Sequence, residues 1–421
     1  MLPIPSLIAA VKATMLLYAA GRSGRPNPYN DPYSSDGYQR PTESAPPAER
    51  LNVALLGAGI FATASHAPML QKLNKNINCV AVWSRTYGNA ASLATKLGAT
   101  PCTDVQQIFN SPNIDAVITA MPIDVQPEYV LKAMHAGKHV YSEKPLATTL
   151  QQAKKLIETY EAHFASRNIA WHVAGQSRYD PAVRTAKQAL ADIGTPFLVN
   201  MKVRAPFLKS SPHSDAMWRN SPEWYGGMIV EAFVHGSSML RGLFGNPISV
   251  SAQTSSRTKH IPSIDTMTAQ VRWPEELHGS VSLTYASTAH CFEIEVVGSE
   301  GRMALMRKEG GPGYSLEVEI SGSKSYKHDI PFGGAETEMM SFVERIRYAN
   351  DPNNNRNTPV EALADMQMVE ACLDSGKQNG VQVFLDPQVT QLAVYADAAE
   401  QAGGGNSNGG AGVVASETIL L

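Results

Sequence analysis

Short apolar runs alternate with longer amphipathic stretches between residues 51 and 171. Uninterrupted apolar runs are typical of strands that are buried on both faces of a parallel sheet. Such strands are expected at 52–56, 79–83, 116–120 and 139–142, with helices between them that include 89–97 and 128–136. Strands that alternate with helices predict βαβ units, which right-handed crossovers arrange as a doubly wound parallel sheet.

After residue 171 the apolar positions follow a period of two. This alternation is typical of antiparallel strands with one buried and one solvated face. Strands are expected at 248–254, 266–273, 280–287, 291–297, 303–306 and 315–320, with a hairpin turn at 298–301. Helices are expected at 181–191, after the glycine pair 226–227, and at 336–348 and 360–377. We therefore predict a C-terminal α+β domain over 172–386 with an open-faced, mostly antiparallel sheet, and the two late helices are expected to return towards the first domain.

The two ends of the chain lack either periodicity. Residues 21–50 are rich in Pro, Ser, Asn, Tyr and Gly, and the glycine-rich stretch 403–412 lies within 387–421. We expect 1–50 to be a disordered extension and 387–421 a flexible tail. Residues 1–20 are apolar-rich and no acid precedes Asp31, so an organelle-targeting or secretory segment is the alternative for this end.

Charge and cysteine content exclude several classes of function. The formal net charge is −3 and no long run of one sign occurs, which argues against a nucleic-acid partner. No apolar run reaches the roughly 18 to 20 residues that a membrane span requires. The four cysteines are far apart and form no Cys-x-x-Cys pair, so we expect neither a metal site nor a disulfide framework. A cytoplasmic protein that acts on a small molecule fits this composition.

The first strand runs directly into a glycine motif, Gly57-Ala58-Gly59-Ile60-Phe61-Ala62. In a Gly-x-Gly-x-x-Ala motif the first glycine permits a tight turn and the second lets the backbone approach a pyrophosphate. The small third residue keeps the next helix close to the sheet, and the helix start at Ile60 and Phe61 supplies N–H groups for phosphates. Residues 51–171 are therefore expected to be a Rossmann domain that binds a nicotinamide dinucleotide.

The end of the second strand bears on which dinucleotide is bound. An Asp or Glu at this place bonds the ribose 2′-hydroxyl of NAD, but this chain reads Ser84-Arg85-Thr86. Hydroxyl groups and a guanidinium suit a 2′-phosphate, so NADP(H) is favoured and NAD(H) is the alternative. Ala120, which ends the next predicted strand, and Pro122 are expected to complete the cofactor site together with Glu143 and Lys144.

Two further motifs suggest redox chemistry. Glu143-Lys144-Pro145 follows the strand at 139–142, at the sheet edge where such folds bind ligands, and a cis Lys144–Pro145 bond suits a tight turn there. Glu231 and His235 are four residues apart, so they share one face of the helix that follows Gly227. A histidine that takes a proton and a lysine that stabilises an alkoxide are what hydride transfer from an alcohol needs.

In this order and spacing, the three motifs resemble the glucose–fructose oxidoreductase / inositol dehydrogenase / MocA (Gfo/Idh/MocA) family. Residues 178–181, 218–223 and 292–298 are similar to further pieces of it, so the resemblance covers 51–386. It implies NAD(P)-dependent oxidation or reduction of a sugar, polyol or related carbonyl compound. It also implies a homo-oligomer formed through the open sheet.

By position, the resemblance implies that Lys144 and His235 are the catalytic lysine and histidine. Glu231 falls where the family usually has Asp, and is expected to orient the pair. Trp218, Arg219 and Arg178 are hypothetical substrate contacts; for Arg178 a role in bracing the domain junction is also open.

Several positions depart from the family pattern. Phe233 replaces a glycine, Ser238 replaces an Asp, and the stretch 121–126 carries Ile123 and Gln126 where an Asn and a His are common. These departures keep two alternatives open. One is a dinucleotide-binding regulator without turnover, as in certain fungal galactose-pathway repressors that resemble the family; the other is a lyase or glycosidase that oxidises its substrate transiently.

Overall fold

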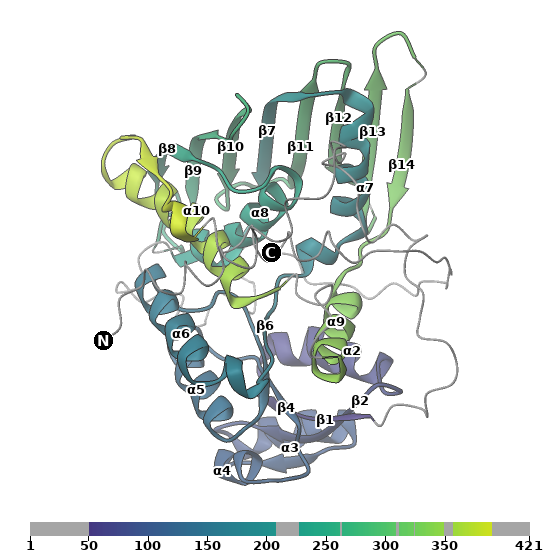
Figure 1. Ribbon diagram of the computed structural model, residues 1–421, viewed down its shortest axis with the longest axis vertical. Coiled ribbons are helices and arrows are strands. Elements are labelled where there is room, and N and C mark those ends of the chain that lie inside the picture. The colour runs from purple at the N-terminus through teal and green to yellow at the C-terminus, as the bar shows by residue number, and fades with distance from the viewer. Residues whose placement is uncertain are drawn as a thin grey trace, which may run out of the picture. The chain divides into compact units, whose positions relative to one another are not determined.

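The computed structural model describes residues 50–207, 227–261, 263–308, 311–323, 325–348 and 357–389 (Figure 1). Most of the predicted N-terminal extension and C-terminal tail lies outside these residues, as do Trp218 and Arg219.

The first sheet is six-stranded and parallel, in the order β3-β2-β1-β4-β5-β6, which confirms the predicted doubly wound sheet. Its strands are β1 (Leu51–Leu56), β2 (Ile77–Trp83), β3 (Thr100–Cys102), β4 (Ala116–Thr119), β5 (His139–Ser142) and β6 (Trp171–Val173). The strand order reverses between β1 and β4, and in such sheets the crevice beside this reversal binds ligands.

Short helices connect these strands: the π-helical turn η1 (Ala62–His66), α2 (Ala67–Lys72), α3 (Tyr87–Leu97), α4 (Val105–Phe109), α5 (Gln126–His135), α6 (Leu150–His163) and η2 (Ala165–Arg167). Two of them begin at side-chain caps, where Asp104 accepts a hydrogen bond from the Gln106 amide and Thr149 accepts one from Gln152. Such caps satisfy amide groups that the first helical turn leaves without a partner.

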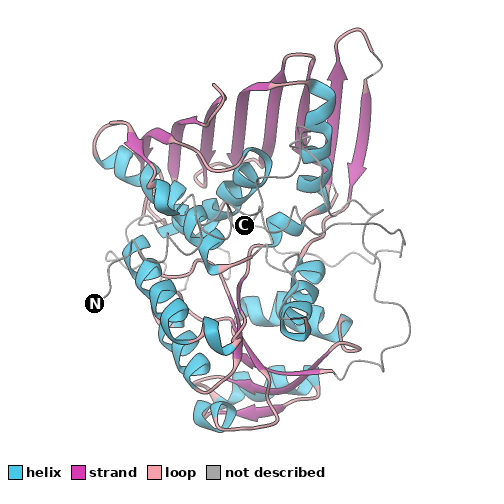
Figure 2. Cartoon of the chain, viewed as in Figure 1, coloured by secondary structure: helices cyan, strands magenta, loops and turns pink. Residues whose placement is uncertain are grey.

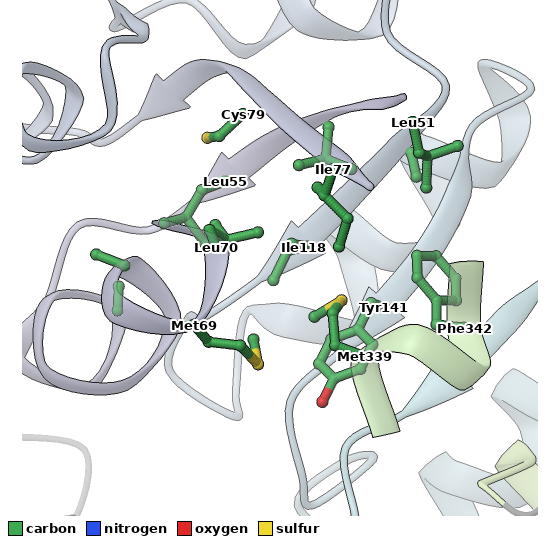
Figure 3. Packing of buried hydrophobic residues seen from close by; sticks show 14 of the residues in the cluster. Leu51, Leu55, Met69, Leu70, Ile77, Cys79, Ile118, Tyr141, Met339 and Phe342 are labelled. Carbon is green, nitrogen blue, oxygen red and sulfur yellow. The ribbon is translucent and has the colours of Figure 1, made fainter. Parts of the chain in front are cut away.

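One late helix completes the core of the first sheet. Helix α9 (Ala335–Arg347) places Met339, Phe342 and Val343, all fully buried, against residues of β1, β2, β4 and β5 (Figure 3). Burying large apolar side chains is the main favourable term in folding, at about 25 cal/mol per Å². The expected return of this helix to the first domain is confirmed.

The second sheet has nine strands in the order β14-β13-β12-β11-β7-β10-β9-β8-β15. They are β7 (Pro196–Arg204), β8 (Ser249–Ser255), β9 (Thr266–Arg272), β10 (His278–Thr284), β11 (Cys291–Gly298), β12 (Gly301–Arg307), β13 (Tyr314–Ile320), β14 (Tyr326–Ile330) and β15 (Val383–Phe384). Only the β7–β10 pair is parallel in this sheet, so the predicted mostly antiparallel character is confirmed.

One face of this sheet is polar, as the period of two predicts. Cross-strand ion pairs join Lys202 to Glu293 at 3.1 Å and Arg302 to Glu319 at 2.6 Å. The other face is buried and is covered by helices (Figure 2).

The helices of this second part are η3 (Gln176–Tyr179), α7 (Pro181–Ala189), η4 (Leu190–Ile193), α8 (Gly227–Phe244) and α10 (Pro359–Lys377). A cluster of four charges joins α8 and η3 to α10: Arg241 of α8 contacts Glu361 at 2.8 Å and Asp365 at 2.5 Å, and Arg178 of η3 reaches Asp365 at 2.7 Å. Two cations and two carboxylates leave the cluster neutral, which a buried set of charges requires.

A buried cap gives the fold a testable dependence on pH. Asp180 precedes α7 and accepts a hydrogen bond from the Ala182 amide at 2.8 Å, while burial raises its pKa to about 6. A carboxyl group with a raised pKa binds its proton more tightly in the folded state, so stability falls as pH rises from about 4 to about 6.

We expect Asp180→Asn to remove this loss, because Asn caps helices without a charge. The gain in Tm over the wild type should be larger at about pH 7.5 than at about pH 4.5 in thermal melts. Parallel curves of Tm against pH for the two proteins would contradict the assignment.

Candidate active site

The glycine loop has the geometry of a phosphate cradle. Gly57 has φ +112°, and a Cβ there would lie 2.2 Å from the main-chain oxygen of Ala120, so only glycine fits between β1 and β4. A Cβ at Gly59 would meet no atom within 4 Å, so the space above it is open. Ile60 and Phe61 stand exposed at the start of the following helical turn. A tight turn, an open backbone approach and a helix start fit a dinucleotide pyrophosphate.

The end of β2 lies beside this loop. The Ser84 amide donates to the main-chain oxygen of Cys102, and the Ser84 hydroxyl accepts a hydrogen bond from the Thr86 amide at 3.3 Å. Arg85 and Thr86 are exposed, and no carboxylate stands between β2 and α3. Tyr87, which opens α3 directly after Thr86, is also exposed.

A buried glutamine supports the Glu143-Lys144-Pro145 loop. Gln126 Nε2 donates to the main-chain oxygens of Glu143 at 2.6 Å and Pro145 at 3.3 Å, and its Oε1 accepts from the Thr119 hydroxyl. The Lys144–Pro145 peptide bond is cis, as predicted. Gln126, which the sequence presents only as a departure from the family pattern, therefore fastens this loop to the end of β4.

Lys144 extends from the first sheet to helix α8. Its Nζ donates to the main-chain oxygen of Glu231 at 3.1 Å, and Glu231 itself is buried. A second buried side chain, Tyr285, lies near Glu231. Burial raises the pKa of its hydroxyl, and the Glu231 carboxylate raises this pKa further. Tyr285 is thus a buried hydroxyl near Glu231 that no sequence motif marks.

His235 lies one turn further along α8. Burial, together with the positive charge of Lys144, lowers the pKa of His235 to about 3. The imidazole is therefore neutral at physiological pH, which is the form that accepts a proton.

Lys144 and His235 line one cavity between the first sheet and helices α8 and α10. Pro145, Leu146 and Met366 form apolar parts of its wall, while Arg178, Ser238 and Asp365 are polar. The Ser238 hydroxyl is buried and makes no hydrogen bond with the described residues. An unsatisfied buried hydroxyl is costly unless it serves a ligand or a water molecule, so Ser238, which the sequence marks only as a departure from the family pattern, is a candidate contact.

The predicted contacts Trp218 and Arg219 lie outside the described residues. Arg178 lines the cavity, but its guanidinium also bonds to Asp365 and to Asn357 Oδ1 at 3.3 Å. Its contact with substrate stays a prediction. Among the described residues no cluster of His, Cys, Asp and Glu is arranged to hold a metal ion, and none of the helices there combines the length and hydrophobicity needed to cross a bilayer.

Sequence comparison agrees with this architecture. Residues 51–165 match the profile of an oxidoreductase family with an NAD-binding Rossmann fold. Residues 183–304 match the C-terminal domain of Gfo/Idh/MocA proteins. The fold and the match define a two-domain oxidoreductase. Because the two profiles together cover more than half of the chain, it belongs to the Gfo/Idh/MocA family.

Individual relatives share the whole architecture. A dehydrogenase (FPY6) of Fusarium mangiferae is 28% identical over 358 residues, which span 78% of this chain and 97% of the relative. The scyllo-inositol 2-dehydrogenase (NAD(+)) of Bacillus subtilis strain 168 is 25% identical, over 80% of this chain and 97% of its own. The crystal structure of an oxidoreductase from Thermotoga maritima superposes with a TM-score of 0.72 at 23% identity, over 82% of this chain and all of that one.

The two loop glycines should respond differently to a methyl group. Gly57→Ala is expected to lower Tm and abolish dinucleotide binding, because the Cβ would collide with Ala120 and the positive φ adds strain of about 1–3 kcal/mol. Gly59→Ala should keep the wild-type Tm, since its Cβ meets nothing, yet lose dinucleotide affinity. Calorimetric titration with NADP(H) and NAD(H) measures both, and unchanged binding in Gly59→Ala would refute the cradle.

Proposed function

We propose that this chain is an NADP(H)-dependent oxidoreductase that acts on a hydroxyl or carbonyl group of a sugar, a polyol or a related compound. The observation that carries the proposal is the presence of Lys144 and His235 in one cavity at the carboxyl end of β5. Membership of the family and the name of the B. subtilis relative, an inositol dehydrogenase, support the substrate class.

In the oxidative direction, neutral His235 takes the proton of the substrate hydroxyl. Lys144, which stands within hydrogen-bond distance of Glu231, donates to the same oxygen and stabilises its developing negative charge. A bound nicotinamide supplies the hydride acceptor. Glu231 orients the pair from α8, and the apolar wall of Pro145, Leu146 and Met366 limits the access of water.

The cofactor preference rests on the end of β2. Ser84 and Thr86 provide hydroxyl groups and Arg85 provides an exposed guanidinium, which together suit the 2′-phosphate of NADP(H). A carboxylate there would repel that phosphate, and none is present between β2 and α3.

Loss of either catalytic side chain should stop turnover without loss of the cofactor. We expect Lys144→Met and His235→Ala to lower kcat by about 10²- to 10⁴-fold, the usual range for a lost acid–base group. NADP(H) should still raise Tm in both variants. Lys155→Met, which changes an exposed lysine on α6, serves as the control.

The assay follows reduced-nicotinamide absorbance with a panel of sugars and polyols. Wild-type activity in both variants would refute the assigned roles. Product without net cofactor reduction would indicate transient oxidation by a lyase or glycosidase. Tight cofactor binding without any turnover would indicate a regulator.

Substitutions at the end of β2 test the predicted preference for NADP(H) over NAD(H). Arg85→Ala should weaken NADP(H) binding roughly 10- to 100-fold, the value of a hydrogen bond to a charged group, and leave NAD(H) binding nearly unchanged. Ser84→Asp should reverse the preference, because the carboxylate repels the phosphate and accepts the ribose hydroxyl. Thermal-shift titrations measure both effects, and equal shifts of the wild type by the two cofactors would contradict NADP(H).

A further inference from the structure

A buried histidine lies between the glycine loop and the Glu143-Lys144-Pro145 loop, called the catalytic loop below. His66 is the last residue of η1, the π-helical turn that begins at Ala62 of the glycine motif. Its side chain is 2% exposed, and its Nε2 lies 2.9 Å from Glu143 Oε1. Single π-helical turns are rare in proteins, but those that occur often lie at functional sites.

Glu143 in turn fixes the residue that follows it. Its second carboxylate oxygen accepts a hydrogen bond from the main-chain amide of Lys144 at 3.2 Å. Its own main-chain amide donates to the oxygen of Thr119, and its main-chain oxygen accepts from Gln126. Glu143 is therefore held by its main chain and by one carboxylate oxygen, and His66 faces the other oxygen from the glycine-loop side.

Aromatic rings hold His66 in place. Its imidazole makes edge-to-face contacts with the ring of Phe61, at 5.3 Å between centroids, and with the ring of Tyr141, at 6.2 Å. Phe61 belongs to the glycine motif, and Tyr141 belongs to β5, where it lies beside Met339 and Phe342 (Figure 3). Edge-to-face pairs of this kind restrict ring orientation and contribute about 0.5–1.5 kcal/mol each.

Apolar packing alone does not explain why a histidine occupies position 66. Both ring nitrogens are buried, and neither makes a well-aligned hydrogen bond with the described residues, although Glu143 is within reach. A leucine or phenylalanine would fill an apolar core at lower cost, since a buried unsatisfied polar group costs about 1–3 kcal/mol. Buried polar atoms left in such a position call for a functional reason.

We propose that His66 is a positioning residue for Lys144, acting through Glu143. A small rotation of the imidazole aligns its Nε2–H with Glu143 Oε1, which lies 2.9 Å away, and the Glu143 carboxylate then holds the Lys144 main-chain amide so that Lys144 stays beside the cavity. The glycine loop, η1 and the catalytic loop then move as one unit, and the dinucleotide and Lys144 keep a fixed relation. This role rests on the proposed function, but the test below does not depend on turnover.

The test measures the reactivity of the Lys144 amine towards an N-hydroxysuccinimide ester of acetate, followed by peptide mass spectrometry. His66→Phe keeps a ring between Phe61 and Tyr141 but removes the donor, and His66→Gln restores a donor without the ring. We expect His66→Phe to raise the rate of Lys144 acetylation about 2- to 10-fold, the value of one hydrogen bond, and His66→Gln to return it towards the wild type.

Two controls separate positioning from general loosening. Lys138 precedes β5 and its Nζ also donates to main-chain oxygens, those of Ser111 and Ile114, so its acetylation rate should stay constant. His172 is equally buried and stacks on Tyr141 at 5.3 Å, but it faces Glu338 instead of Glu143. His172→Phe keeps a ring against Tyr141 but removes the imidazole, so it should leave the labelling of Lys144 unchanged.

A double-mutant cycle identifies the route. In a Glu143→Gln background, His66→Phe should cause no further increase in the rate of Lys144 acetylation, because the Glu143 carboxylate that links the two residues is already lost. Additive effects would overturn the proposal, as would an unchanged rate in His66→Phe or an equal increase in the Phe and Gln variants. If His66→Phe does not fold, His66→Leu, which also removes the donor, replaces it in the same cycle with the same expected increase.

Activity gives an independent second measurement once a substrate is known. His66→Phe should lower kcat more than it weakens NADP(H) binding, and it should raise the deuterium isotope effect on kcat because hydride transfer becomes slower. A chain that turns over no substrate at all refutes the proposed function and leaves the acetylation test intact. Normal turnover with unchanged acetylation refutes only the role of His66.

Discussion

The hydrogen bond from the Lys144 ammonium to the main-chain oxygen of Glu231 fixes how the two parts of the site meet. Lys144 follows β5 of the first sheet, whereas Glu231 and His235 belong to α8. Reacting groups must stand within about 3–3.5 Å for efficient transfer, so a site built from the loop after β5 and from α8 requires that α8 be held firmly. A main-chain oxygen on a helix is a well-defined partner, because its position does not depend on a side-chain rotamer.

Buried charge provides this firmness behind α8. Burial disfavours the charged Arg241 guanidinium, but Glu361 and Asp365 outweigh that effect and raise its pKa. Removing one member of such a cluster leaves an uncompensated buried charge, at a cost of about 3–5 kcal/mol. The cluster therefore fixes where α8 lies on α10. Because Arg178 and Asp365 also line the cavity, the same charges shape one of its walls.

The sequence predicted the parts of the fold that repeat a strong local pattern. The strands at 52–56 and 139–142, the glycine loop and the cis proline follow from apolar runs and turn chemistry. Strands β3, β6 and β15 were not predicted because they are too short to show a period. Strand β7 was not predicted because its exposed Phe197 and Leu198 break the alternation. The proposed role of His66 could not be predicted for another reason. It depends on Glu143, which lies far along the chain and comes close to His66 only when β5 pairs beside β4.

The departures from the family pattern do not all bear on the substrate. Gln126 bonds the Glu143-Lys144-Pro145 loop, and Phe233 packs beside Gly236, at which a Cβ would lie 2.7 Å from the Phe233 ring. Ser238 is different, because it lines the cavity with an unsatisfied hydroxyl where a carboxylate is common. The carboxylates that pair with Arg178 come instead from α10, so position 238 presents a neutral donor and acceptor. A neutral hydroxyl favours a neutral hydroxylated ligand over a cation, and the proposal of a sugar or polyol agrees with that chemistry.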